Sequence, residues 1–299
     1  MIRHFVSDLD GTLLNQAFEW DRVIESGVRK LLTLGHDFAA ATGRTIGGAK
    51  TLRGLWELPV YLILMNGSLV LDKKREIILS REVSRETRKL CLERCRNAGL
   101  EFITKDYTLT RLGREEYIRR YSAWDMWRKK VLEKKESGYF DQFLGRILFD
   151  ATEEEILQAP VLKINGLELD DTKYQQLLQE LEEALKDAVN APFADHVLEI
   201  TDIEASKAKT LGWLSQKLGW KQEETAVFGD GGNDVEMLRS FPHSYAPVNA
   251  ADAARQAAKE VTESCSEYGV LKKMLELTDI FPDTGKKAPS VSNKSAGFL

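Results

Sequence analysis

The sequence predicts an α/β protein in which a Rossmann-like, mostly parallel sheet core carries an inserted α+β domain. Three observations favour this fold class. Short apolar runs alternate with helical patterns, as buried parallel strands and their crossover helices do. Two of these runs end in acidic, glycine-containing turns, at 8–12 and at 229–234. A highly charged, irregular stretch separates the two halves of this alternation.

The first half of the predicted sheet comes from residues 1–82. Its strand patterns are continuous apolar runs, its helical patterns carry apolar residues on one face, and Gly35 ends the first helix. The expected elements are a strand over 3–9, a helix over 20–34, a strand over 36–41, a helix over 46–55, a strand over 60–65 and a hairpin over 68–78 that turns at Asp72 and Lys73. Open sheets of this kind bind ligands beyond the carboxyl ends of their strands, where Asp8, Asp10 and Thr42 lie.

From Glu82 onward the composition changes, and residues 83–195 are expected to form the inserted domain. We expect helices over 86–98 and 172–185, and strands over 146–149, 161–164 and 196–200. The sequence leaves the pairing of these strands open. The α/β pattern then resumes with a helix over 206–218, a strand over 225–228, a helix from 235 and a strand over 244–248. The core is therefore expected to be discontinuous, over 1–82 and 196–280, and residues 281–299 are expected to form a mobile tail.

Composition and charge argue against several classes of protein. The 299 residues are 43% hydrophobic and 30% charged, the balance of an ordinary globular protein. With 42 Lys and Arg against 47 Asp and Glu, the net charge of −5 argues against a nucleic-acid partner. The longest apolar stretches, such as 59–65, are far shorter than the roughly 20 residues of a membrane-spanning helix, which argues against a membrane protein.

Two further features bear on the compartment. The N-terminus lacks the pattern of a secretory signal, so we expect a cytoplasmic protein. Cys91, Cys95 and Cys265 are expected to be thiols without a metal or redox role, because no further Cys or clustered His supplies ligands.

Asp8 and Asp10 form the sharpest local feature of the sequence. Two carboxylates separated by one residue after a buried strand are electrostatically costly without a cation, and Gly11 allows the backbone to turn close to a ligand. A plain turn or helix cap is the alternative. A second cluster, with Asp230 and Asp234, follows another strand of the same parallel sheet, so the two clusters converge. Their carboxylate oxygens favour an octahedral Mg²⁺ site over a zinc site.

Four short motifs in a fixed order resemble those of the haloacid dehalogenase superfamily of phosphohydrolases. They are Asp8-Leu9-Asp10-Gly11-Thr12, Ala41-Thr42-Gly43-Arg44, Ser206-Lys207, and Gly229-Asp230 with Asn233-Asp234. The layout, with Met237-Leu238 and Asn249-Ala250, looks like the Cof-type branch, in which an α/β cap is inserted between the second and third motifs. The resemblance covers 1–82 and 196–277, and in the insert it rests on position and size alone.

The resemblance implies a Mg²⁺-dependent phosphatase that works through an aspartyl-phosphate. Asp8 would be the nucleophile, and Asp10 would act first as the general acid and then as the base. Thr42 and Lys207 would hold the phosphoryl oxygens. Ser206 can cap the helix that Lys207 begins, and the first turn of a helix is a poor place for a lysine unless an anion lies nearby.

The resemblance also implies a ligand set for the metal. In this family the ligands are the nucleophile, the backbone carbonyl of the second Asp and the first Asp of the last motif, which correspond to Asp8, Asp10 and Asp230. Asp234 would be a further ligand or an outer group. Asn233 would orient metal-bound waters or the loop that faces the cap.

Arg44 and Asn66 are candidate substrate-binding residues, each with a structural alternative. Arg44 would contact the substrate phosphate or the cap, or else form a structural ion pair. Asn66 would belong to the floor of the crevice, or else only to a turn that ends a strand. Ala208 stands where the family usually has glycine, and Pro247-Val248 stands where the branch usually carries Met-Gly; neither departure removes a catalytic group.

The inserted domain is expected to select the substrate, a small phosphorylated metabolite, because a cap over the crevice excludes water and contacts the leaving group. A sugar phosphate is favoured, followed by pyridoxal phosphate, flavin mononucleotide or a nucleotide. One segment of the insert either binds such a ligand or forms a half-buried aromatic face with a basic flank: Tyr117, Arg119, Arg120, Tyr121, Trp124, Trp127 and Arg128. A phosphomutase that uses the same intermediate, and a non-catalytic phosphate-binding regulator, stay open as alternatives, as does the oligomeric state.

Overall fold

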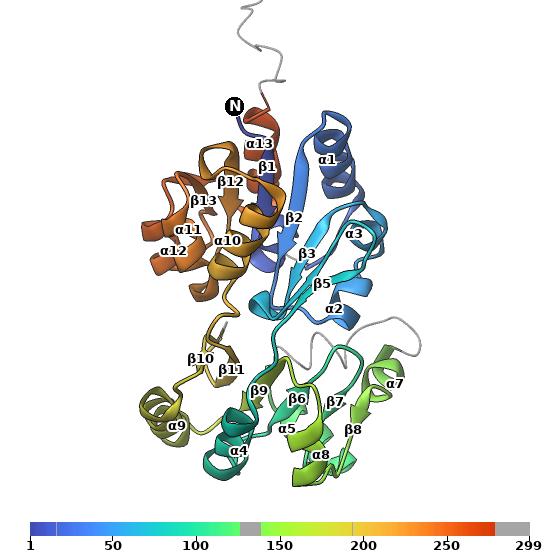
Figure 1. Cartoon of the computed structure of the whole chain (residues 1–299), viewed down its shortest axis with the longest axis vertical. Coiled ribbons are helices and arrows are strands. Elements are labelled where there is room, and N and C mark those ends of the chain that lie inside the picture. Colours follow the sequence, from blue (N-terminus) through green and yellow to red (C-terminus); the bar gives the residue numbers. More distant parts are fainter. Residues whose placement is uncertain (16, 126–138, 193, 279–299) are drawn as a thin grey trace, which may run out of the picture.

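The computed structural model describes residues 1–15, 17–125, 139–192 and 194–278. Within them the strands form one sheet of eight strands and one of six. Figure 1 shows these sheets in two units, which we call the core and the insert, the insert running from α4 (Arg85–Arg94) through β11 (Val197–Asp202). Trp127, Arg128 and the expected tail 281–299 lie outside the described residues.

The core sheet has the strand order β14-β13-β12-β1-β2-β3-β4-β5. Neighbours from β14 to β3 run parallel, and the hairpin of β4 and β5 adds two antiparallel strands at one edge. The strands are β1 His4–Ser7, β2 Asp37–Ala41, β3 Tyr61–Leu64, β4 Leu69–Leu71, β5 Ile77–Ser80, β12 Thr225–Phe228, β13 His243–Pro247 and β14 Glu260–Thr262. The predicted α/β class and its mostly parallel sheet are confirmed.

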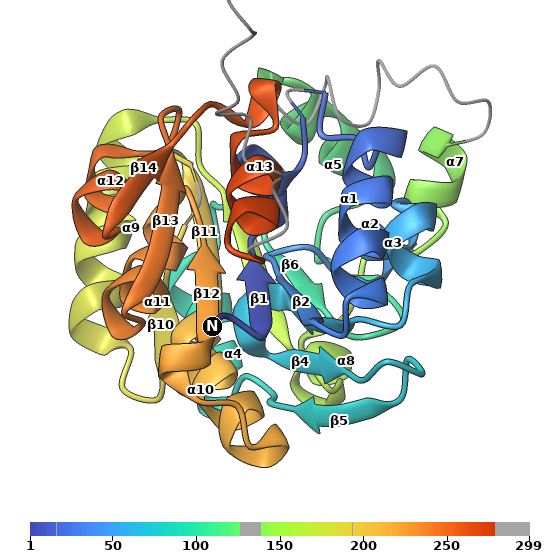
Figure 2. The same cartoon turned by 90° about the horizontal axis from the view of Figure 1, so that it is seen from above.

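Helices cover both faces of the core sheet, as Figure 2 shows from above. One face packs against α1 (Arg22–Thr33), α2 (Ile46–Lys50), α3 (Arg53–Glu57) and α13 (Gly269–Glu276). The other face packs against α10 (Lys207–Leu218), α11 (Val235–Ser240) and α12 (Asp252–Ala257). The two apolar layers bury the central strands on both sides, which is why those strands read as continuous apolar runs.

The helix expected over 46–55 is two short helices instead. α2 ends at Lys50, α3 begins at Arg53, and Leu52 between them has the non-helical angles φ −89° and ψ 72°. Two adjacent glycines, Gly47 and Gly48, lower the helix propensity of α2, and the hydroxyl of Thr51 donates to the Gly48 carbonyl at 2.7 Å. The prediction of one continuous helix was therefore wrong.

The insert is built on the sheet β10-β11-β9-β6-β7-β8, antiparallel except between β7 and β8. Its further strands are β6 Glu101–Ile103, β7 Thr108–Leu109, β8 Ile147–Leu148, β9 Lys163–Leu167 and β10 Ala188–Asn190. Its further helices are α5 Arg114–Ser122, α7 Tyr139–Leu144, α8 Glu153–Gln158 and α9 Asp171–Ala184. β11 belongs to this sheet, so the chain returns to the core after residue 202 rather than at the expected residue 196.

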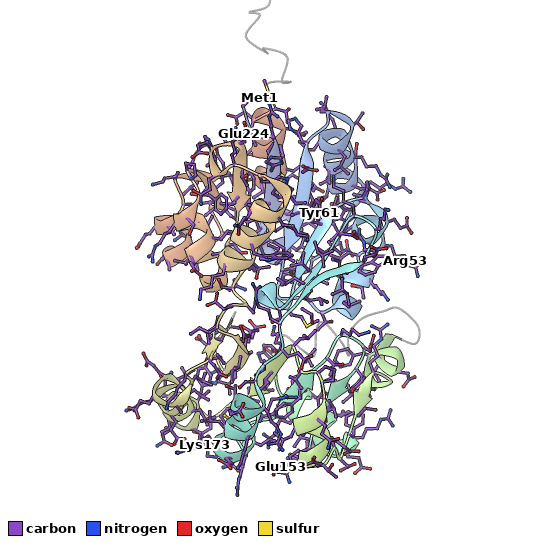
Figure 3. The ribbon with its side chains drawn as sticks, viewed as in Figure 1. Met1, Arg53, Tyr61, Glu153, Lys173 and Glu224 are labelled. Atoms are coloured by element: carbon purple, nitrogen blue, oxygen red, sulfur yellow. The ribbon has the colours of Figure 1, made fainter. Side chains whose placement is uncertain are left out.

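The insert sheet has two different faces. One face packs against α4, α8 and α9 in an apolar cluster of its own. The opposite face packs partly against α5 and α7, and the rest of it is turned toward the core. Figure 3 shows side chains filling both units, with Glu153 and Lys173 at the end of the insert far from the core. The insert therefore meets the core through one face of its sheet.

Two expectations about composition can be compared with the fold. Among the described residues, no helix combines the length and the apolar character needed to cross a membrane. All three cysteines of the chain are buried free thiols.

Candidate active site

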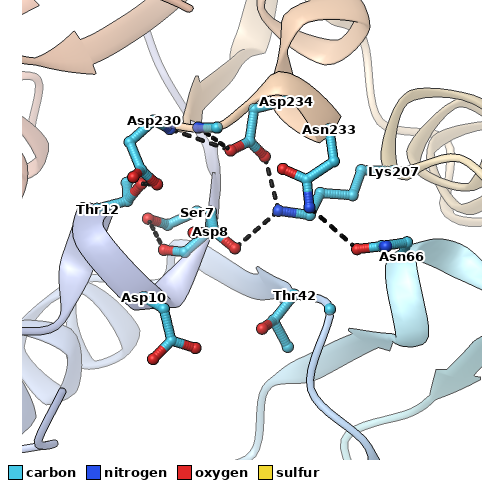
Figure 4. Close-up of polar contacts among 12 residues, drawn as sticks. Ser7, Asp8, Asp10, Thr12, Thr42, Asn66, Lys207, Asp230, Asn233 and Asp234 are labelled. Atoms are coloured by element: carbon cyan, nitrogen blue, oxygen red, sulfur yellow. Dashed lines mark hydrogen bonds and ion pairs between the residues drawn. The ribbon is translucent and has the colours of Figure 1, made fainter. Parts of the chain in front are cut away.

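Predicted site residues gather where parallel strands of the core end. Asp8 directly follows β1, Thr42 follows β2, and Asp230 lies two residues beyond β12. Asn66 lies in the short turn after β3, Met65–Gly67. Since parallel strands end at the same edge of a sheet, their loops share one crevice, and Figure 4 shows these side chains around Asp8.

Lys207 reaches the crevice from the start of α10. The Ser206 side chain caps this helix by accepting a hydrogen bond from the N–H of Lys209 at 3.0 Å. Lys207 is thus the first helical residue, as the sequence indicated.

The Lys207 ammonium bridges two carboxylates. Its Nζ lies 2.7 Å from Oδ1 of Asp8 and 2.7 Å from Oδ1 of Asp234. Asp8, Asp234 and Lys207 are 5%, 0% and 1% exposed. Burial raises the pKa of Asp8 well above its ordinary value, against the opposing effect of Lys207. Although burial acts in the other direction, the carboxylates of Asp234 and Asp8 raise the pKa of Lys207, so its ammonium stays protonated.

The loop after β12 is held by its own acidic side chains. Asp234 Oδ2 accepts hydrogen bonds from the N–H groups of Asp230 and Gly231, both at 3.0 Å. The Thr12 hydroxyl donates to Asp230 Oδ1 at 2.6 Å across the crevice. Thr12 stands inside the first motif but was not singled out as a site residue. Its contact fixes the Asp230 carboxylate relative to the loop that carries Asp8.

Asp8, Asp230 and Asp234 form a group that can hold a cation. One carboxylate oxygen from each lies within 4.8 Å of the others. Burial raises the pKa of Asp230 as well. Three carboxylates against one ammonium leave an excess of negative charge, and an all-oxygen donor set suits Mg²⁺.

Gly11 leaves the space that this group needs. Its φ is +84°, and a Cβ at this position would lie 2.3 Å from Asp230 Oδ2. Any side chain here would push the Asp230 carboxylate away and strain the backbone. The donor set and this cradle both fit a bound divalent cation, with the carboxylates of Asp8, Asp230 and Asp234 as the side chains available to it.

Asp10 is paired with Arg44 and does not join the carboxylate group. Nε and Nη2 of Arg44 donate to the two carboxylate oxygens of Asp10, each at 2.6 Å. The Asp10 carboxylate points away from Asp8 in Figure 4. Of the two expectations for Arg44, the structure has the ion pair, and it is a bidentate one, the strongest geometry for a carboxylate.

Thr42, Asn66 and Asn233 link three loops. The Thr42 hydroxyl oxygen accepts from the N–H of Arg44 at 3.2 Å, and the Thr42 carbonyl accepts from the N–H of Asn66 at 3.1 Å. The Asn233 amide donates to Oδ1 of Asn66 at 3.1 Å. Asn66 is 3% exposed and has a φ of +57°. It is a residue of the turn after β3, and its hydrogen bonds join the loops after β2 and β12.

Two charged residues of the insert reach these loops, and neither was predicted. Lys163 on β9 and Glu199 on β11 form an ion pair and are 3% and 2% exposed. The Lys163 ammonium also donates to the Gly43 carbonyl at 3.3 Å. Their one signal in the sequence is a lysine and a glutamate within apolar strand patterns. That signal has no meaning until the strands are paired.

The aromatic segment of the insert mostly faces inward. Tyr117 and Tyr121 on α5 are 0% and 4% exposed, and their hydroxyls donate to the Glu101 carboxylate and to the Gly99 carbonyl. Arg119 pairs with Glu116 on the exposed side of the helix. Of the two interpretations of this segment, its described residues, which exclude Trp127 and Arg128, form the half-buried aromatic face with a basic flank.

Comparison with known proteins gives a consistent answer. The family model of haloacid dehalogenase-like hydrolases matches residues 5–274. Phosphatase YwpJ of Bacillus subtilis (strain 168) is 27% identical over 281 residues, which cover 90% of this chain and 98% of that protein. The 5-amino-6-(5-phospho-D-ribitylamino)uracil phosphatase YwtE of the same organism is 24% identical over 276 residues, 88% of this chain and 93% of its own.

Solved structures have the same fold. A haloacid dehalogenase-like hydrolase from B. subtilis superposes with a TM-score of 0.77 at 23% identity, over 92% of this chain and all of the other. The HAD subclass IIB sugar phosphatase BT4131 superposes with a TM-score of 0.73 at 21% identity, over 93% of this chain and 100% of its own.

Proposed function

Because the chain belongs to the haloacid dehalogenase-like hydrolases, as its motifs predicted, we propose that it is a Mg²⁺-dependent phosphatase of small phosphomonoesters that works through an aspartyl-phosphate on Asp8. The observation that carries the proposal is the buried arrangement of Asp8, Lys207 and Asp234 beside Asp230. A nucleophile, a fixed cation and further carboxylates meet there at the ends of parallel strands. A protein that only bound phosphate would have no use for a nucleophilic carboxylate in contact with that cation.

Asp8 is the proposed nucleophile. Its carboxylate oxygen attacks phosphorus, the bond from phosphorus to the ester oxygen breaks, and the leaving alkoxide takes a proton from Asp10. Water then attacks the same phosphorus and gives a proton to Asp10, and the bond from phosphorus to Asp8 breaks to release inorganic phosphate. The two steps return both carboxyl groups to their starting forms.

Arg44 is proposed to control the ionisation state and the orientation of the Asp10 carboxyl group. A bidentate guanidinium stabilises the ionised carboxylate, which is the form that accepts a proton from water in the second step. The first step requires a protonated Asp10 turned toward the leaving group. We propose that substrate binding separates Asp10 from Arg44 and lets Asp10 take up a proton from water. The pair re-forms once Asp10 has given this proton to the leaving group.

Lys207 and Thr42 are the proposed holders of the phosphoryl oxygens. The Lys207 ammonium already lies against the nucleophilic carboxylate, so a phosphoryl group on Asp8 comes within its reach. Thr42 follows the neighbouring strand, and its hydroxyl proton can serve as a second donor. The charge that develops on the phosphoryl oxygens is thereby met by donors already in position.

Asp8, Asp230 and Asp234 are the proposed side-chain ligands of Mg²⁺, together with the backbone carbonyl of Asp10. Bound there, Mg²⁺ offsets the repulsion between the carboxylates and a phosphate dianion. Asn233 orients the loop between Asp230 and Asp234 through its bond to Asn66.

A sugar phosphate, or a similar polyol phosphate, is the proposed substrate class. BT4131 is described as a sugar phosphatase, and YwtE acts on a phosphate ester of a ribityl chain. The substrates that these two names describe are phosphate monoesters of a polyhydroxylated carbon chain. The insert is proposed to act as the cap that covers such a leaving group.

The proposal is tested by measuring phosphate release from an aryl phosphate and from a panel of sugar phosphates. We expect activity that EDTA abolishes and Mg²⁺ restores, and none in Asp8→Asn. Asp106→Asn, which removes an exposed carboxylate that pairs with Lys105 in the insert, is the control and should match the wild type. Full Mg²⁺-dependent hydrolysis by Asp8→Asn would refute the mechanism, and isomer interconversion without net phosphate release would identify a mutase.

A further inference from the structure

A chain of buried polar contacts joins the insert to the loops of the crevice. Glu199 pairs with Lys163 through Oε1 and accepts from the Asn66 amide through Oε2 at 3.4 Å. Asn66 in turn accepts from Asn233 at 3.1 Å, and Lys163 donates to the Gly43 carbonyl at 3.3 Å. We call Lys163, Glu199, Asn66 and Asn233 the inter-unit network. It touches the loops after β2, β3 and β12, which are the loops of the candidate active site.

The network is more than a packing contact. Both side chains of the Lys163–Glu199 pair are almost fully removed from water, and this burial lowers the pKa of Lys163 from 10.5 to about 7. Burying such a pair costs desolvation free energy that its mutual attraction only partly returns, and an apolar pair of similar size often stabilises a fold as well or better. Stability alone therefore gives no reason for an ion pair at this point of contact. The position of the pair against the loops of the candidate active site does give a reason, because the pair can orient those loops.

Asn66 is the residue through which Glu199 acts on the core. It sits in the left-handed region, and its own N–H bonds to the Thr42 carbonyl, so its orientation is coupled to the loop that carries Thr42. The Asn66 side chain also packs closely against Gly43, because a Cβ added at Gly43 would lie only 3.0 Å from Asn66 Oδ1. Glu199 and Asn233 hold the two ends of the same amide, which fixes it between the loops after β2 and β12.

We infer that Glu199, held by Lys163, is a positioning residue that couples the docking of the insert to the geometry of the phosphoryl-holding loops through Asn66. The inference rests on the proposed phosphatase function. Glu199 does not need to touch substrate: with the insert docked, its carboxylate sets the Asn66 amide, and Asn66 sets Thr42 and Asn233. Closing of the insert and completion of the site then become one event.

The test compares Glu199→Gln, Asn66→Ala and the double variant on an aryl phosphate and on a hexose 6-phosphate, in the full chain with Mg²⁺. Gln keeps the size and loses the charge that holds Lys163. We expect kcat to fall about tenfold on both substrates while KM changes less than about twofold. Because Glu199 acts through Asn66, the double variant should be no slower than Asn66→Ala alone.

The matched control is Glu168→Gln. Glu168 is a buried glutamate directly after β9 of the same sheet, but its carboxylate accepts from the N–H of Asp170, within the insert. It should leave kcat unchanged. If Glu199→Gln itself fails to fold, Lys163→Met with Glu199→Gln removes both charges together, leaves no unpaired one, and should show the same loss of kcat.

Three results would overturn the inference. A loss confined to the hexose phosphate, with a raised KM, would make Glu199 a contact of the leaving group. Losses that multiply in the double variant would separate Glu199 from Asn66. If Glu199→Gln kept the wild-type kcat and only its melting temperature fell, the role of Glu199 would be purely structural.

Hydrogen exchange separates this inference from the proposed function. In Glu199→Gln we expect faster exchange of the amides around Thr42 and Asn66, with no change in peptides of α4 or α9. This measurement needs no turnover. If the wild type hydrolyses no phosphate ester, the proposed function fails while the exchange result still decides whether Glu199 holds the loops; unchanged exchange would contradict the coupling.

Discussion

The ammonium of Lys207 lies 2.7 Å from Asp8 Oδ1 and 2.7 Å from Asp234 Oδ1, and all three side chains are almost fully buried. One side chain thus joins the loop after β1 to the loop after β12. The stability of the fold and the proposed chemistry therefore both depend on the Lys207 ammonium.

Lys207→Met should lower both stability and activity. It leaves Asp8 and Asp234 as buried carboxylates without their shared partner, so we expect the free energy of unfolding to drop by about 3–5 kcal/mol. Turnover should fall at least about 100-fold, because a donor to the phosphoryl group is lost. Added Mg²⁺ should restore part of the stability. Thermal unfolding with and without Mg²⁺ measures this, and Lys209→Met, at a partly exposed pair with Glu204, is the control. An unchanged melting temperature in Lys207→Met would contradict the account.

Gly11→Ala should weaken Mg²⁺-dependent activity while the fold survives. The added Cβ meets Asp230 Oδ2 at 2.3 Å, so the carboxylate must leave its place. Gly35→Ala is a close match, since Gly35 has a φ of +85° and open space around its Cβ position. Both variants should lose about 1 kcal/mol of stability from the backbone alone. Only Gly11→Ala should raise the Mg²⁺ concentration needed for half activity; equal behaviour of the two would show that the cradle is unimportant.

Arg44→Gln should slow the second chemical step more than the first. Without its bidentate partner, Asp10 loses the contact that holds it ionised and in place as the base. We expect kcat to fall about tenfold, with a burst of leaving-group release before the slow steady state. Stopped-flow kinetics with an aryl phosphate detect the burst. Loss of activity without any burst would instead place the role of Arg44 before the first step.

Asp37 should make stability depend on pH in the acid range. The hydrogen bond from His4 and the contact with Lys73 lower the pKa of Asp37 from 3.8 to about 2. A folded-state pKa below the unfolded one means that the ionised carboxylate stabilises the fold above about pH 4, and that this contribution is lost as the pH falls toward 2. Between those limits the wild type should lose about 1–2 kcal/mol more than Asp37→Asn. Parallel denaturant titrations at several pH values measure the difference, and superimposable profiles would refute the assignment.

The core and its crevice could be predicted because local signals coincide there. Apolar runs fix β1 and β12, parallel pairing brings Asp8 and Asp230 to one edge, and the Ser206 cap explains why α10 begins at Lys207. The family assignment rested on these residues and is confirmed by the match over 5–274.

Contacts between distant loops could not be predicted in the same way. Arg44 and Asp10 are 34 positions apart, and nothing local decides whether Arg44 turns toward a ligand or toward Asp10. Lys163 and Glu199 meet because β9 pairs with β11, and strand pairing in the charged insert leaves no periodic signal. For the same reason the chain's return to the core was placed before β11 rather than after it.

The central claim is that Asp8 carries the phosphoryl group, and trapping that intermediate tests it most directly. Asp10→Asn should be phosphorylated by an aryl phosphate and should hydrolyse the product slowly, because the base for water is missing. After an acid quench and proteolysis at low pH, peptide mass spectrometry should find one phosphoryl group on Asp8, and none when Asp8→Asn is combined with Asp10→Asn. A phosphoryl group on any other residue, or release of phosphate in a single step with Asp8 unmodified throughout, would contradict the account.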